Sequence, residues 1–299
     1  MKKNKSIKAY EIAHFLGAKL FGENINIKNV VPINLLTEHS FAFVKKFSNE
    51  YVDLINSYPS SLVICTDEYK DKIRSSYIIS DNPGLDFLRA IENFFYPSRS
   101  IGINATAKVD PNALLGKDTF IGANTVIGPE VSIQDGTSIF HNVVIQGKVS
   151  IGKGCVIKSG AVIGEEGFGF EYDEFGIPEH FPHIGSVEIG DNVWIGAGTS
   201  IERAHIYKTI IKNNVKIDDL VQVGHNCVIN ENSIITSGTV LCGAVVVGKN
   251  CWIAPNSSIK ERVKLGDNVF VGLGAVVIND VPPKTVVVGN PAKKLKERL

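Results

Sequence analysis

Residues 121–163 read IGANTVIGPEVSIQDGTSIFHNVVIQGKVSIGKGCVIKSGAVI, and this stretch decides the fold. Isoleucine opens the stretch and returns at every sixth residue up to Ile163. An α-helix repeats about every 3.6 residues and a half-buried strand about every two, so neither explains this period. The period predicts a solenoid in which each hexad is a short strand and a turn, and the repeated residue points into an apolar core.

The period of six continues on both sides of this stretch. Apolar residues keep it over residues 103–163 and again over residues 211–277, and glycine follows many of them. It is interrupted over residues 164–188 and again in the short segment AHIYKT at residues 204–209. If three hexads form one coil, residues 18 apart should stack in adjacent coils.

The chain therefore divides into parts with different patterns. We predict a mainly β fold, a parallel β-helix over residues 99–285 with an inserted loop at 164–188, followed by a C-terminal tail at 286–299. Residues 1–98 lack the period: IKAYEIAHFLGAKL has helical apolar spacing, SLVIC and SYIIS resemble buried strands, and PGLDFLRAIENFFYP resembles a helix stopped by Pro97. These patterns predict a small α/β domain before the solenoid.

Aromatic residues gather in one stretch of this domain, FAFVKKFSNEYV, which contains Phe43, Phe47 and Tyr51. Aromatic side chains usually belong to the core, and they can also stack on a flat ligand ring. Both interpretations are open from the residues alone.

Composition excludes several classes of function. The chain has 31 basic and 31 acidic residues, which predicts no general affinity for nucleic acid or for an anionic membrane. No apolar run is long enough for a signal-peptide core or a membrane span, so we expect a cytoplasmic protein. The five cysteines show no CxxC pairing and are expected to be small buried residues, with no metal site.

Three motifs in order carry a family resemblance: GEEGFGF, HIGSVEIGDNVWIGAG and IDDLVQVGHNCVI. They resemble the UDP-3-O-acylglucosamine N-acyltransferases of lipid A synthesis. The resemblance implies a left-handed helix, a homotrimer with active sites between neighbouring solenoids, and an N-terminal domain that binds the uridine nucleotide. It also implies an amine acceptor on a nucleotide-linked amino sugar and an acyl thioester donor. Asp219 stands where the family usually has asparagine, and Arg262 stands about where its members carry a second active-site histidine.

The last residues, DVPPKTVVVGNPAKKLKERL, resemble a different branch, the acetyl-CoA-dependent hexapeptide acetyltransferases that modify sugars for envelope polysaccharides. That resemblance implies that Gly289, Asn290, Pro291 and Lys293 contact the phosphates of CoA. A basic terminus without a ligand is the alternative. We therefore favour acetyl-CoA as donor, with a 3-hydroxyacyl group on acyl carrier protein as the alternative.

Acyl transfer to an amine needs a base and donors for the developing oxyanion. His225, two residues after the periodic Val223, is the candidate base, because the pKa of histidine lies near physiological pH. Asp218 is the candidate for orienting that base. Asp219 and Gln222, with Asn226 after the histidine, are candidates for substrate contact.

Two comparisons within the sequence bear on these roles. His141 has the same phase as His225, two residues after Ile139, so the repeat alone tolerates a histidine there and we take His141 as structural. Gly243 lies 18 residues after His225 and should stack on it, where its N–H is a candidate oxyanion donor. An ordinary turn glycine is the alternative.

The inserted loop is rich in aromatic residues and contains two histidines. Long insertions in regular scaffolds tend to be functional, so Phe168 and Phe170 are candidates for walling the acceptor pocket or for packing on a neighbouring subunit. His180 and His183 either touch phosphate or sugar or lie solvated in the loop, and we take His183 as the substrate-binding candidate.

Two other classes of function compete with acyl transfer. A carbonic anhydrase on this scaffold needs three histidines that converge on zinc, and the chain lacks its close histidine spacing, since His205 and His225 are 20 residues apart. We therefore predict no metal. A solenoid that serves only assembly or binding is the non-catalytic alternative, and the context of His225 is the argument against it.

Overall fold

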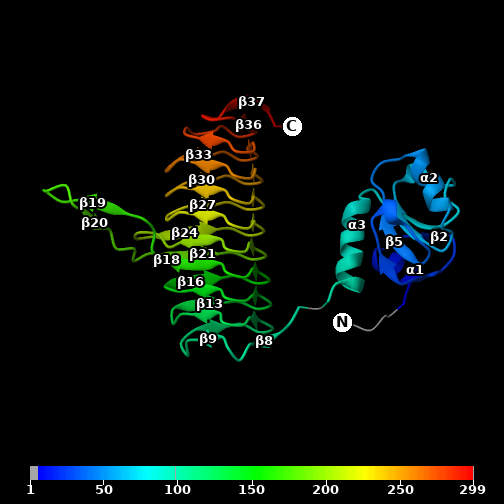
Figure 1. Cartoon of the computed structure of the whole chain (residues 1–299), viewed down its shortest axis with the longest axis horizontal. Helices are drawn as coiled ribbons and strands as arrows, with labels where there is room; N and C mark the ends of the chain where they lie inside the picture. Colours follow the sequence, from blue (N-terminus) through cyan, green and yellow to red (C-terminus); the bar gives the residue numbers. More distant parts are fainter. Residues whose placement is uncertain (1–5, 98, 299) are drawn as a thin grey trace. The chain divides into compact units, whose positions relative to one another are not determined.

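The computed structural model describes residues 6–97 and 99–298. The chain forms two compact units, with the boundary along the sequence after residue 98 (Figure 1). The division falls between residues 98 and 99, where the sequence analysis separates the α/β segment from the solenoid. Each unit has its own apolar core, and each is described by itself.

The first unit is a small α/β domain. Its five-stranded sheet has the order β2-β7-β6-β5-β4, with β4 to β7 parallel and β2 antiparallel. Asn82 begins α3 by accepting the N–H of Leu85, and Pro83 occupies its first turn, where a missing N–H costs nothing. The elements are β1 (Ile7–Lys8), α1 (Ala9–Phe15), β2 (Leu20–Phe21), β3 (Asn26–Ile27), β4 (Asn29–Val30), β5 (Ser40–Phe43), α2 (Asn49–Asn56), β6 (Leu62–Cys65), β7 (Ser76–Ile79) and α3 (Pro83–Ala90), with short helices at Ile33–Leu35, Asp67–Tyr69 and Ile91–Phe95.

The second unit is a β-helix whose three faces are parallel sheets (Figure 1). The eight-stranded sheet contains β10 (Leu114–Leu115), β13 (Val131–Ile133), β16 (Lys148–Ile151), β21 (Ser186–Ile189), β24 (Lys208–Ile211), β27 (Val228–Ile229), β30 (Val246–Val247) and β33 (Lys264–Leu265). The nine-stranded sheet contains β9 (Lys108–Val109), β12 (Val126–Ile127), β15 (Val144–Ile145), β18 (Val162–Glu165), β23 (Ser200–Glu202), β26 (Gln222–Val223), β29 (Val240–Leu241), β32 (Ser258–Ile259) and β35 (Val276–Val277). The eleven-stranded sheet contains β8 (Gly102–Ile103), β11 (Phe120–Ile121), β14 (Ser138–Ile139), β17 (Val156–Ile157), β22 (Trp194–Ile195), β25 (Lys216–Ile217), β28 (Ile234–Ile235), β31 (Trp252–Ile253), β34 (Phe270–Val271), β36 (Thr285–Val288) and, antiparallel, β37 (Lys293–Glu297).

The period of six produces this fold as predicted. Ile121 pairs with Ile139 in the next coil, 18 residues on, and both side chains are fully buried. At many corners an asparagine adopts the left-handed conformation that a sharp turn needs, as at Asn142 (φ 55°) and Asn226 (φ 62°). A histidine followed by asparagine is therefore part of the corner pattern, and it does not by itself mark a site.

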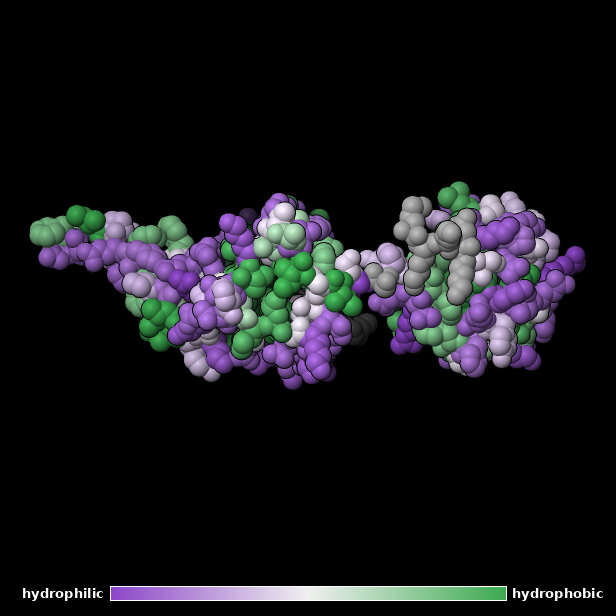
Figure 2. Space-filling model, turned by 90° about the horizontal axis from the view of Figure 1, so that it is seen from below, coloured by the Kyte–Doolittle hydropathy of each residue, from purple (hydrophilic) through white to green (hydrophobic). Residues whose placement is uncertain are grey.

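The two ends of the solenoid differ. Figure 2 shows apolar residues gathered at the end formed by the first coils, where Ile101, Ile103 and Leu114 are more than half exposed. At the other end the segment expected to be a tail adds β36 and β37 to the eleven-stranded sheet. Residues 286–299 thus continue the solenoid over the described part, because Val286 and Val287 pair with β34.

Candidate active site

The inserted loop is a β-hairpin that projects from the solenoid (Figure 1). Its strands are β19 (Phe170–Tyr172) and β20 (Pro178–His180), paired antiparallel. The far end is apolar yet exposed, with Tyr172 and Phe175 at 74% and 80% exposure. Such exposed aromatic residues are typical of a contact surface and not of a core.

Arg203 ties both ends of this hairpin to the solenoid. Its guanidinium donates to the carbonyl of Gly164 (3.0 Å), to the carbonyl of His183 (2.7 Å) and to Glu166 Oε1 (2.6 Å). Burial opposes the charge of Glu166, but the N–H of His183 and the guanidinium together hold the pKa of Glu166 below its ordinary value. One side chain therefore fixes where the hairpin leaves and rejoins the solenoid.

Replacing Arg203 by methionine is expected to loosen the hairpin base. The change leaves two partly buried carbonyls without their donor, so amide hydrogen exchange of residues 164–167 and 181–185 should accelerate by about tenfold. Mass spectrometry of peptic fragments measures this rate. Lys208→Met, which removes the exposed pair with Glu188 (2.6 Å), is the matched control. Unchanged exchange in the arginine variant would contradict the role.

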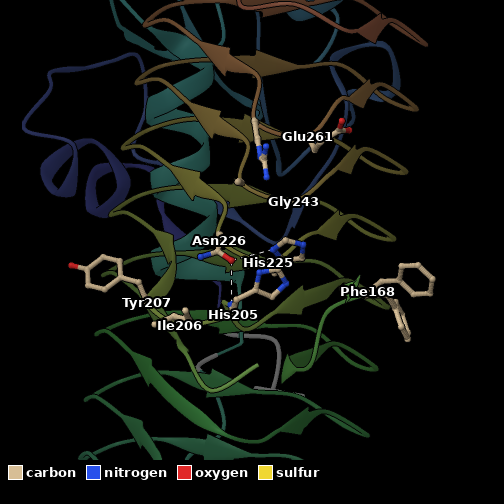
Figure 3. A pocket seen from close by; sticks show the side chains of 12 residues that line it. Phe168, His205, Ile206, Tyr207, His225, Asn226, Gly243 and Glu261 are labelled. Carbon is tan, nitrogen blue, oxygen red and sulfur yellow. Dashed lines mark hydrogen bonds between the residues drawn. The ribbon is translucent and has the colours of Figure 1, made fainter. Parts of the chain in front are cut away.

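A cleft of about 760 Å³ lies where the hairpin base meets the solenoid (Figure 3). A volume of this order suits a small organic ligand. Its walls come from the hairpin base and from the corners of four successive coils. The lining residues are Phe168, Gly169, Phe170, His205, Ile206, Tyr207, His225, Asn226, Gly243, Ala244, Glu261 and Arg262.

The stacking rule places three of these residues in one column. His225, Gly243 and Glu261 are 18 apart, and all three line the cleft. A Cβ on Gly243 would lie 2.6 Å from Cε1 and Nε2 of His225, closer than atoms can approach. The imidazole of His225 therefore packs directly against Gly243, and a residue with a side chain there would displace the ring. Glu261 and Arg262 were not predicted as site residues, although two further steps of 18 from His225 and Asn226 reach them.

Two neighbours hold His225. Its backbone N–H donates to Glu202 Oε2 (3.0 Å), and its Nδ1 lies 3.1 Å from Asn226 Oδ1. That oxygen also accepts the backbone N–H of His205 (3.1 Å), which identifies it as the acceptor. Nδ1 of His225 therefore carries the proton in the neutral ring, and Nε2 keeps its lone pair.

The carboxylate of this site was missed by the sequence analysis. Glu202 is 9% exposed, and its Oε1 accepts Nε2 of Gln222 (3.0 Å), so Gln222 contacts Glu202. The available signal was an acidic residue directly after the periodic Ile201, in the coil before His225. Asp218, the predicted orienting residue, follows β25 in another sheet and lies at another corner, while His225 follows β26. Within one chain the structure does not bring Asp218 and His225 together.

Asp219 has a structural environment. It accepts Lys158 Nζ (2.6 Å) and the N–H of Ala197 (2.7 Å), and these two bonds hold the pKa of Asp219 below its ordinary value. The predicted substrate contact of Asp219 therefore has no support within the single chain. Its carboxylate instead joins three successive coils at one corner.

Two further histidines lie against His225. The ring centroids of His205 and His225 are 4.0 Å apart, and those of His183 and His205 are 4.2 Å apart. Burial is the main cause that lowers the pKa of His205 to about 4 and also lowers the pKa of His183. The structure thus brings His183 to the site, but as a buried side chain at the base of the hairpin.

The structure brings together three histidines whose convergence the sequence analysis did not predict. A nitrogen from each of His183, His205 and His225 lies within 4.8 Å of the other two, an arrangement able to hold a metal ion. Stacking at 18 residues does not reveal this cluster, because the coil here is longer: Ser200 pairs with Gln222, 22 residues on. His183 and His205 are also 22 residues apart, one such coil.

The aromatic candidates of the first unit pack on its cores. Phe43 lies 4.6 Å from Phe87 between ring centroids, and Phe47 lies 5.0 Å from Tyr69. Tyr51 is partly buried against the same cluster as Phe47. A lysine ammonium lies over each phenylalanine, at 5.9 Å for Phe43 and 4.1 Å for Phe47. Their role as a ligand platform stays a prediction.

The candidates for donor phosphates lie at the C-terminal end of the solenoid. Gly289, Asn290 and Pro291 form the turn between β36 and β37, and Lys293 begins β37. Gly289 has a φ of 94°, a conformation that favours glycine, so the turn explains this residue without a ligand. Their contact with CoA stays a prediction.

Two curated relatives of this chain carry the same name. A relative from Helicobacter pylori, UDP-3-O-acylglucosamine N-acyltransferase, is 35% identical over 82% of this chain and 75% of its own length. One from Coxiella burnetii with the same name is 36% identical over 89% of this chain and 83% of its own length. The chain belongs to the UDP-3-O-acylglucosamine N-acyltransferase family. It is an acyltransferase, and the family recognised from GEEGFGF to GHNCVI is confirmed.

The repeat and the fold have matches of their own. The family model described as bacterial transferase hexapeptide (six repeats) matches residues 130–165, 208–243 and 244–279. A solved structure of LpxA from Acinetobacter baumannii is 27% identical, with a TM-score of 0.60 over 65% of this chain and 74% of that one. LpxA of Bacteroides fragilis, a UDP-N-acetylglucosamine acyltransferase, is 26% identical, with a TM-score of 0.59 over 66% of this chain and 74% of that one. The predicted left-handed parallel β-helix is confirmed.

None of the helices within residues 6–97 and 99–298 has the length and apolar character to cross a bilayer.

Proposed function

We propose that the chain transfers a 3-hydroxyacyl group from acyl carrier protein to the amine of UDP-3-O-acylglucosamine, a step of lipid A synthesis. The relatives that carry this name match most of the chain, N-terminal domain included. The acetyl-CoA preference rested on a resemblance limited to the last residues. Relatives matched over 89% of the chain outweigh it, so the alternative donor becomes the proposal.

The observation that carries the proposal is Nε2 of His225, which holds a lone pair and lies beside Gly243. Asn226 Oδ1 accepts the Nδ1 proton, so Nε2 can take a proton from the sugar amine as that amine attacks the thioester carbonyl. The C–N bond then forms, the C–S bond breaks, and the proton passes to the departing thiolate. This chemistry needs no cofactor beyond the thioester.

The oxyanion of the intermediate is assigned to the N–H of Gly243. Among the described residues this N–H has no acceptor, and the missing side chain lets a carbonyl approach closely. Arg262 supplies a fixed positive charge in the same cleft and suits the diphosphate of a nucleotide sugar. Asn226 Oδ1 orients the ring of His225, the role expected of Asp218, while Glu202 accepts the backbone N–H of that histidine.

Assembly as a homotrimer and uridine binding by the first unit complete the proposal. The side chains of Ile206 and Tyr207 line the cleft and are 69% and 70% exposed, and Phe168 at the hairpin base is 84% exposed. An apolar rim of this kind suits cover by a neighbouring solenoid. Sedimentation equilibrium tests the trimer, and loss of uridine diphosphate binding in Phe43→Ala tests the platform. The cytoplasmic location stays a prediction.

The experiment that tests the proposal compares the two candidate acyl donors. The purified chain is incubated with 3-hydroxyacyl carrier protein or with acetyl-CoA, and with UDP-3-O-acylglucosamine or a panel of UDP- and dTDP-linked amino sugars, and product masses are followed. We expect turnover with the carrier protein and the UDP-linked acylated amine. UDP-N-acetylglucosamine, whose amine is blocked, is the matched control acceptor.

Each other outcome has a distinct meaning. Turnover with acetyl-CoA alone would replace the proposed donor by the one inferred from residues 286–299. Turnover of a dTDP-linked amine alone would replace the acceptor. Absence of turnover with every pair would favour the non-catalytic alternative and overturn the proposal.

A further inference from the structure

The geometry points to a site for a divalent cation at His183, His205 and His225, with Zn²⁺ as the ion that this donor set suits best. One ring nitrogen of each histidine lies within 4.8 Å of the other two. Three histidines and one open position form a common zinc coordination set in enzymes.

Hydrogen bonds fix the tautomers that a metal would need. Nδ1 of His183 lies 2.8 Å from the carbonyl of Phe181, which can only accept, so Nδ1 is the donor and Nε2 holds a lone pair. Nδ1 of His225 is held in the same way by Asn226 Oδ1. Metal-binding histidines are usually oriented through such a bond from their second ring nitrogen.

Two of the three Nε2 atoms are buried without a partner. Among the described residues, Nε2 of His183 and Nε2 of His205 have no hydrogen-bond partner and no contact with solvent. The His183 side chain is 0% exposed. Buried polar atoms nearly always have partners, and a cation shared by these nitrogens would supply one to both.

The hairpin base leaves room for an ion beside these nitrogens. A Cβ on Gly167 would lie 3.0 Å from His183 Nε2, and a Cβ on Gly169 would lie 2.7 Å from His205 Nε2. Any other residue at either position would fill that space. Zinc–nitrogen bonds of about 2.0–2.1 Å require the rings to rotate inward from their present positions. The stacked rings of His205 and His225, inclined by 25°, are the ones that must separate.

Binding has a consequence for acyl transfer, and this consequence rests on the proposed function. A cation bound to Nε2 of His225 occupies the lone pair that would take the proton of the amine. Zn²⁺ is therefore an inhibitor of the transferase, released by a chelator. The site links the activity of the chain to the concentration of free zinc.

The primary test measures metal binding without any substrate, so its outcome does not depend on the proposed function. The chelator-treated full chain is titrated with Zn²⁺ by calorimetry and with Co²⁺ by visible absorption. We expect one ion per chain, with the intense bands of tetrahedral Co²⁺. Zn²⁺ should also raise the melting temperature, since it binds only the folded chain.

Variants separate this site from others. His205→Ala and His183→Gln should weaken Zn²⁺ binding by at least about 100-fold, because each removes one ligand. His141→Ala, a histidine in the same corner position, should leave binding unchanged, and so should His180→Ala. The second control also tests the neighbouring group of Glu166, His180 and His183. Gly169→Ala keeps all three histidines and should weaken binding by filling the space for the ion.

Clear results would overturn the inference. Absence of stoichiometric Zn²⁺ binding by the folded wild-type chain would do so. Equal affinity in wild type and in His205→Ala, or loss of binding in His180→Ala, would place the ion elsewhere. Zinc binding with an inactive transferase would leave the cation site intact and reject only the proposed function.

Discussion

Replacing His225 by alanine is expected to lower kcat/KM for acyl transfer by about a thousandfold, or about 4 kcal/mol of transition-state stabilisation. The physical reason is the loss of the general base that takes the proton from the amine as it attacks the thioester. The assay measures product mass against time in a chelator-containing buffer, so that no metal affects the comparison. Circular dichroism and sedimentation check that the variant keeps its fold and assembly.

His141 provides a matched control for this variant. It occupies the same corner position, two residues after a periodic isoleucine, and its Nδ1 accepts the N–H of Ala123 (2.9 Å). His141→Ala should keep full activity and lose a small amount of stability. Equal activity of His225→Ala and wild type would remove His225 from the mechanism.

Replacing Gly243 by alanine is expected to lower kcat by about a hundredfold with little change in the melting temperature. The new methyl group would lie 2.6 Å from two atoms of the His225 ring, so the imidazole must move by about 1 Å. Displacements of that size at a catalytic base cost about two orders of magnitude. Steady-state kinetics of the variant at saturating donor measures the effect.

A double variant shows how the glycine acts. If Gly243 acts by positioning His225, adding Gly243→Ala to His225→Ala should change the rate little, because the ring is already gone. Additive losses would show that the added methyl group acts independently of the ring, as expected if it keeps the carbonyl from the backbone N–H of residue 243. Gly128→Ala is the control, since a Cβ there meets its nearest atom at 3.3 Å and lies far from the cleft in sequence and in coil. A fully active Gly243→Ala would contradict both roles.

The fold could be predicted because the hexapeptide period leaves few alternatives. Within residues 121–163 and within residues 211–277, each periodic residue is apolar and buried, and each pairs with a residue 18 positions away, as Ile121 does with Ile139. The inserted loop was also evident, since no hexad accommodates residues 164–188, but its β-hairpin form was not predicted. The position of Gly243 under His225 followed from the same arithmetic.

The arithmetic failed where the coils lengthen. Four extra residues at the corner after Glu202 give the pairing of Ser200 with Gln222, and this shift brings His205 beside His225. The hairpin base then brings His183 to the same place. A rule of 18 could not find these contacts, because the size of an irregular corner depends on packing that the period does not encode.

The sequence by itself determined the β-helix, the family and the identity of His225 as the residue in question. These follow from local regularity, because a chain with an apolar residue at every sixth position buries those residues by coiling into a solenoid. The tertiary structure alone decided the neighbours of that histidine, because Glu202, His205 and His183 come from separate coils and from a hairpin base. It gave the orienting role expected of Asp218 to Asn226 and placed the one candidate base in a cluster of three histidines.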